Sequence, residues 1–136
     1  MIAFLICAVS VAALTQLMSA YCRSILSSTR RVELSERVRE VAGFASDQVG
    51  AGDFGRLLQL VHLCPQQGDD HGEIRAVGVY YFTVRTLQRA TGSLVPPIAA
   101  WATRECERCS YFAAVALDRR ISYSRDLFMQ QMGSRA

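Results

Sequence analysis

The N-terminal segment constrains this chain more than any other. The run from Met1 to Cys22, MIAFLICAVSVAALTQLMSAYC, contains no charged side chain, and Arg23 follows it directly. As an α-helix rising about 1.5 Å per residue, this run would be roughly 33 Å long, and the hydrocarbon core of a bilayer is about 30 Å thick. The sequence therefore predicts a transmembrane anchor over 1–22 and a separate domain over 23–136.

Two other interpretations of this run stay open. A cleaved secretory signal normally has a basic segment before its apolar stretch and small residues three and one before the cut. No Lys or Arg precedes Ile2, and the best small-residue site, Ala20, has Met18 at the minus-three position. The third interpretation is a core helix of a soluble domain, which such a long apolar run disfavours. We therefore favour a retained anchor.

Basic residues flank the run on one side only, namely Arg23, Arg30, Arg31, Arg37 and Arg39. The positive-inside bias then predicts an N-terminus outside the cell and a cytoplasmic C-terminal domain. The cysteine content agrees with a reduced compartment, because five cysteines without a dense paired pattern do not indicate a disulfide framework.

Small and polar residues form a stripe along the anchor, made of Ala8, Ala12, Thr15, Gln16 and Ser19. Small side chains let helix backbones approach closely, and an amide in lipid needs a hydrogen-bond partner. We therefore predict a packing face at Ala8, Ala12, Gln16 and Ser19 for another transmembrane helix. An ordinary single-pass helix with the same residues is the alternative.

The composition excludes several classes of enzyme. All 15 basic residues are Arg, so a Walker A lysine, a Schiff-base lysine and a Ser-Lys pair are absent. No glycine-rich phosphate loop and no GxSxG motif occurs. Histidine is present only at His62 and His71. We therefore expect no catalytic residues and no enzyme activity.

The chain beyond the anchor predicts an all-α bundle of three or four helices. Apolar side chains lie on both sides of the third expected helix, so this helix should be largely buried. A strand over 77–84 is the alternative structure for the middle of this segment. The first two expected helices are 23–48, continuous with the anchor as one rod, and 54–64, with Asp53 as N-cap. The third is 71–90, with Ile74, Val77, Tyr81 and Val84 on one face and Val79, Tyr80 and Phe82 on the other. The fourth is 96–131, the central helix.

Cys106 and Cys109 are the only pair that resembles a chemical site. A CxxC pair supplies half of a zinc site or acts as a redox dithiol. The pair lies about ten residues inside its helix, away from the N-terminal dipole that lowers thiol pKa values, and no second CxxC occurs. A metal or redox site would use Cys106 and Cys109, with Cys64 or His71 as further candidate ligands. The alternative is two small core residues, which implies no cofactor.

Nucleic-acid binding has little support. Two basic pairs, Arg30-Arg31 and Arg119-Arg120, occur among interleaved acids, and no recognition motif accompanies them. The first pair suits anionic lipid headgroups, and the second is expected to be solvated surface. We therefore expect the lipid bilayer, and no nucleic acid, as a partner.

The sequence as a whole favours a membrane-tethered, non-catalytic accessory or scaffold subunit. The anchor would pack against a membrane protein partner or against a second copy of the chain. The alternative is a thiol or metal-binding helical protein that uses Cys106 and Cys109.

Overall fold

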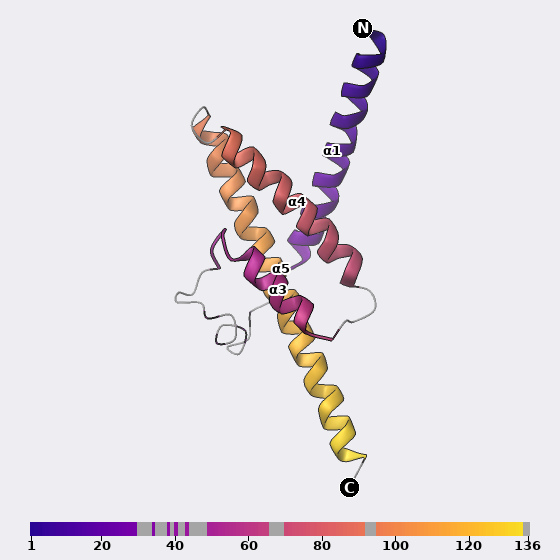
Figure 1. The fold of residues 1–136 in the computed structure, drawn as a ribbon, viewed down its shortest axis with the longest axis vertical. Helices are drawn as coiled ribbons and strands as arrows, with labels where there is room; N and C mark the ends of the chain where they lie inside the picture. Colours follow the sequence, from indigo (N-terminus) through magenta and orange to yellow (C-terminus); the bar gives the residue numbers. More distant parts are fainter. Residues whose placement is uncertain are drawn as a thin grey trace.

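The computed structural model describes residues 1–29, 34, 38, 40, 43, 49–65, 70–91 and 95–134. Four helices and no strand occur in these ranges, namely α1 (Ile2–Thr29), α3 (Phe54–Leu63), α4 (Asp70–Thr91) and α5 (Pro96–Gly133). Figure 1 shows α1 projecting from a small bundle of the other three. The predicted fold, an apolar N-terminal helix followed by a small helical bundle, is confirmed.

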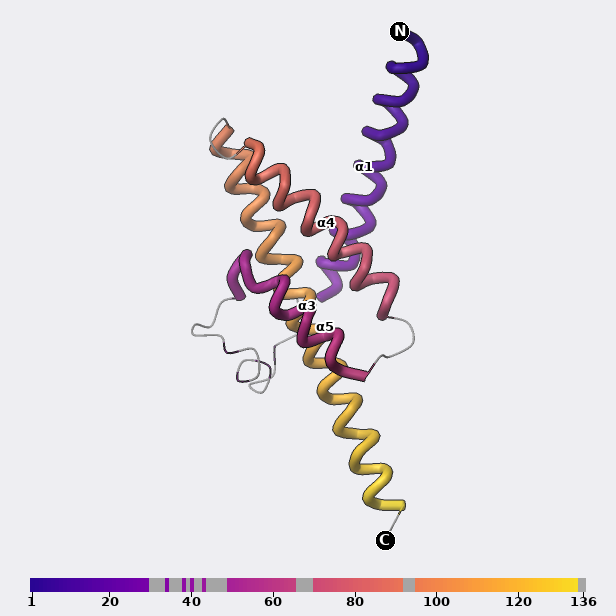
Figure 2. The backbone as a smooth tube through the Cα atoms, viewed as in Figure 1, coloured from indigo at the N-terminus to yellow at the C-terminus, as the bar shows by residue number. Residues whose placement is uncertain are grey.

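Helix α1 belongs to the bundle only at its C-terminal end. Every residue from Met1 to Leu17 is exposed, whereas Cys22 and Leu26 are buried between α4 and α5. The free part of α1 extends away from the other helices in Figure 2. The helix is long and apolar enough to cross a membrane.

The predicted continuity of the anchor with the chain that follows is confirmed as far as Thr29. Hydroxyl groups in this segment donate to carbonyls of their own helix, as Ser28 does to Ile25 at 2.7 Å, so they do not interrupt it. The predicted unbroken helix to Gln48 is wrong, because Leu34 lies outside any helix, although Val38 and Glu40 are helical. Most other residues of 30–48 lie outside the described part.

Helix α5 is the central helix, as predicted, and it begins at Pro96. Its buried face consists largely of small residues, which lets neighbouring backbones approach closely. Beyond Ile121 the helix extends past the bundle and is largely exposed (Figure 1). The predicted members of the face that are buried are Ala102, Cys106, Cys109, Ala113 and Ala116, whereas Ile98 is exposed.

Helix α4 buries one face rather than most of its circumference. Tyr80 takes the buried position that was expected for Tyr81, and Tyr81 stacks instead on Phe54 with ring centroids 4.2 Å apart. Val79 and Phe82 are 56% and 73% exposed, so the prediction of a largely buried helix is wrong. The reason is that α5 and α1 pack on one side of α4 and leave its outer side uncovered.

Helix α3 is short, and a side chain from α5 binds its C-terminal end only. The carboxylate of Asp53, the predicted N-cap, accepts a hydrogen bond from the Gly50 amide at 2.9 Å and makes no cap bond to α3. At the other end, Arg120 Nη1 donates to the Val61 carbonyl at 2.7 Å. A guanidinium group suits this position because the last carbonyls of a helix lack partners and carry partial negative charge.

The role of Arg120 corrects the sequence prediction. Its side chain was expected on a solvated surface, but it is 2% exposed and lies between α5 and the end of α3. Its Nε atom has no hydrogen-bond partner among the described residues. The interaction with Val61 therefore compensates only part of the cost of burying this charge.

Candidate functional site

The structure forms a cleft of about 410 Å³ where α1 leaves the bundle beside α5. Three guanidinium groups and one carboxylate line it, so its formal charge is positive. We call it the basic cleft. Its lining residues are Arg23, Leu26 and Ser27 from α1, and Trp101, Arg104, Glu105 and Arg108 from α5.

Glu105 organises the floor of the basic cleft. Its carboxylate is 2% exposed, and a buried charge is costly unless it is paired. Oε1 accepts a hydrogen bond from Arg108 Nη1 at 2.6 Å, and Oε2 accepts one from the Tyr80 hydroxyl at 3.3 Å. Glu105 therefore holds Arg108 in place and links α5 to α4.

The remaining two arginines differ in how they are held. The Arg23 guanidinium carbon lies 5.7 Å from the centroid of the Trp101 ring, within the range of a cation–π interaction. Arg104 is exposed and forms no ion pair with any residue in the described ranges. Its positive charge is therefore available to a ligand.

Tyr80 stays a neutral hydrogen-bond donor beneath the cleft. Burial of the phenol, with an added contribution from the negative charge of Glu105, raises the pKa of Tyr80 from 10.0 to about 12, against a weaker lowering by Arg23. At neutral pH the hydroxyl therefore keeps its proton and continues to donate to Glu105.

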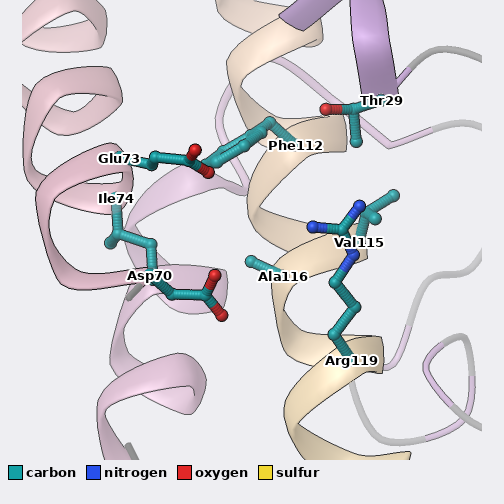
Figure 3. A pocket seen from close by; sticks show the side chains of 8 residues that line it. All are labelled: Thr29, Asp70, Glu73, Ile74, Phe112, Val115, Ala116 and Arg119. Carbon is teal, nitrogen blue, oxygen red and sulfur yellow. The ribbon is translucent and has the colours of Figure 1, made fainter. Parts of the chain in front are cut away.

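A second, much smaller cavity lies between α4 and α5. Figure 3 shows the carboxylates of Asp70 and Glu73 directed from α4 toward the space, with the Arg119 side chain on the side of α5. The cavity has a volume of about 10 Å³, which accommodates roughly one water molecule. It is too small to be a ligand site.

The predicted thiol pair, Cys106 and Cys109, lies in the core. Both side chains are 0% exposed and neither forms a disulfide. Burial is the main cause that raises the pKa of both thiols, and the negative charge of Glu105 adds to the rise. The positive charge of Arg85 lowers the pKa of Cys106 by a smaller amount. The thiolate is the form that binds metals and attacks electrophiles, so this environment disfavours both reactions.

The other residues considered for a metal site do not join this pair. His71 is exposed in the first turn of α4, and Cys64 follows the end of α3. Within the part of the chain that the structure describes, no group of three or more His, Cys, Asp or Glu side chains is close enough to hold a metal ion.

We expect Cys106 and Cys109 to resist maleimide in the folded protein and to react after denaturation. Because labelling follows the thiolate fraction and access, their rates should be about tenfold or more below that of partly exposed Cys64. Mass spectrometry of peptides after timed labelling measures all three rates in one sample. Equal rates for the three thiols would contradict the buried arrangement.

The predicted packing face of α1 has no partner within the chain. Ala8, Ala12 and Gln16 are exposed, and Ser19 is partly exposed. The hydroxyl of Ser19 donates to the Gln16 carbonyl at 2.9 Å, so its own helix satisfies it. The use of this face by another helix stays a prediction.

Sequence reasoning did not identify the basic cleft. Arg104 and Arg108 are four residues apart and so share a helix face, which is a weak signal by itself. Arg23 joins them only because α1 packs beside α5, and no local pattern indicates that contact. Comparison of the chain with protein families, with curated proteins and with solved structures finds no match.

Proposed function

We propose that this chain is a single-pass membrane protein that serves as a non-catalytic accessory or scaffold subunit. The observation that carries the proposal is a contrast within α1. Its residues Met1 to Leu17 are exposed, uncharged and largely apolar, whereas Cys22 and Leu26 are buried. Soluble monomers rarely expose such a large continuous apolar surface, because contact with water is unfavourable by about 25 cal/mol per Å². A bilayer removes that cost.

The charge distribution supports a cytoplasmic bundle. Arg23 is the first charged residue after the apolar run, and further arginines follow it closely. The positive-inside bias therefore favours an N-terminus outside the cell. The five cysteines are free, which suits a reduced compartment.

Three exposed surfaces support an accessory role. The stripe of small residues on α1 suits close packing with another membrane helix. Phe82 on α4 and Phe128 near the end of α5 are 73% and 68% exposed, so the bundle also leaves large apolar side chains uncovered. The buried, protonated thiols favour this role over the thiol or metal alternative.

A pull-down of tagged full-length protein from detergent-solubilised membranes tests the partner directly. We expect a membrane protein, or a second copy of the chain, to co-purify in stoichiometric amount. Exchange of Ala8 and Ala12 for leucine should abolish this association because bulk at the packing face separates the backbones. The control variant Ala13→Leu adds the same side chain outside that face, because successive residues of a helix point about 100° apart. It should leave the association intact.

Mass spectrometry identifies the partner, and metal analysis is performed on the same sample. If the variant with leucine at positions 8 and 12 retains its partner, the packing face is wrong. If the wild-type protein purifies alone and carries zinc or iron, the accessory role is wrong and the cysteine alternative is favoured.

A further inference from the structure

We infer that the basic cleft binds the phosphate group of an anionic membrane lipid. This inference rests on the proposed membrane location and adds a ligand site to it. Its three supports are the depth of the cleft relative to the apolar segments, the charge and geometry of its arginines, and its size.

The cleft lies at the boundary between apolar and charged parts of two helices. Arg23 is the first charged residue after the apolar run of α1, and Arg104 is the first after residues 90–103, which carry no charge. In Figure 1 the free part of α1 and the end of the bundle where α4 meets α5 extend to the same side. If α1 crosses a bilayer, Arg23 therefore lies near the headgroups, and Arg104 lines the same cleft.

Trp101 supports the same depth. Tryptophan is enriched where hydrocarbon meets headgroups, because its ring is apolar and its N–H group is polar. Trp101 lies one helical turn before Arg104 and Glu105 in the α5 wall, and Arg23 lies against its ring. The aromatic and cationic side chains thus occur together in one wall, as an interfacial site requires.

The charges in the cleft suit a phosphate group. Arg23, Arg104 and Arg108 oppose the single carboxylate of Glu105, which leaves a formal charge of +2. A guanidinium group donates two parallel hydrogen bonds to phosphate oxygens, and Arg108 is already oriented by its contact with Glu105 at 2.6 Å. The volume of about 410 Å³ is within the usual range for small-molecule sites.

The test uses the full chain in phosphatidylcholine vesicles that contain phosphatidylglycerol. Trp101 is the only tryptophan, so its fluorescence reports on the cleft alone. Bromine on the acyl chains of one lipid or the other quenches this fluorescence in proportion to the occupancy of that lipid beside Trp101. We expect stronger quenching by the anionic lipid at equal mole fraction.

Substitutions assign the preference to the cleft. Arg104→Gln should lower the relative binding constant for phosphatidylglycerol about fivefold, the effect of one basic residue near an anionic surface. Arg104 is exposed, so this change should not disturb folding. Arg125→Gln removes the same charge from the exposed far end of α5 and should leave the constant unchanged.

Three outcomes would overturn the inference. These are equal quenching by both lipids in the wild-type protein, an unchanged constant in Arg104→Gln, and loss of the preference on addition of inorganic phosphate, which would indicate a soluble ligand. Co-sedimentation with the vesicles is measured in parallel. Protein that sediments without lipid preference contradicts only the cleft, whereas protein that stays in solution contradicts the membrane location itself.

Discussion

Replacing Val11 with arginine is expected to remove the chain from the membrane fraction of cells that express it. Val11 lies midway along the apolar run and is 58% exposed, so nothing in the bundle depends on it. Arginine at the centre of a membrane helix costs about 2.5–3.5 kcal/mol on insertion scales, whereas the valine that it replaces is favourable.

Alkaline extraction of membranes, followed by detection of the tagged protein in pellet and supernatant, measures this effect. Val11→Leu is the matched control, because it changes the side chain at the same position but keeps it apolar, and it should stay in the pellet. Circular dichroism of the purified variants checks that both remain helical. Retention of Val11→Arg in the pellet would contradict the anchor.

A second large effect is expected from Leu117→Ala, which should lower the free energy of unfolding by about 2–5 kcal/mol. Leu117 is 1% exposed and belongs to the same buried cluster as Leu57 and Val61 of α3. Its truncation removes apolar contacts and leaves a cavity that the surrounding helices fill only partly. Because α3 has ten residues, it depends on such contacts for its stability.

Leu127→Ala provides the matched control for this experiment. Leu127 lies on the same helix but is 39% exposed beyond the bundle, so the same chemical change should alter the free energy of unfolding by no more than about 0.5 kcal/mol. Denaturant titration of the full chain in detergent, followed by circular dichroism, measures both variants. Equal losses in the two would contradict the assignment of the core.

Local sequence patterns predicted the helices because each carries its own signals. Pro96 and Pro97 indicate the start of α5, Pro65 the end of α3, and the apolar spacing of α4 its helical rather than strand structure. The same spacing left the exact orientation of α4 undecided. Tyr80 and Tyr81 are both aromatic, and only the positions of α1 and α5 determine which one is buried.

The features that the sequence did not predict depend on contacts between distant segments. Arg120 is buried because the unpaired carbonyls at the end of α3 lie beside it, and no pattern around Arg120 indicates this neighbour. The basic cleft likewise needs Arg23 and Arg104, which are far apart in the sequence, on facing helices. Periodicity identifies the face of a helix but not which helix will cover it.

The length of α5 gives the bundle a rigid spacer. The helix continues without glycine or proline from Ile98 to Met132, so its extent is fixed by its residue count. At about 1.5 Å per residue, Gly133 lies roughly 48 Å along the axis from Trp101. If Trp101 lies at the headgroups, as proposed, a protein that docks beside Met132 is held at a fixed distance from Trp101. The direction of the α5 axis then determines how that protein is oriented relative to the bilayer.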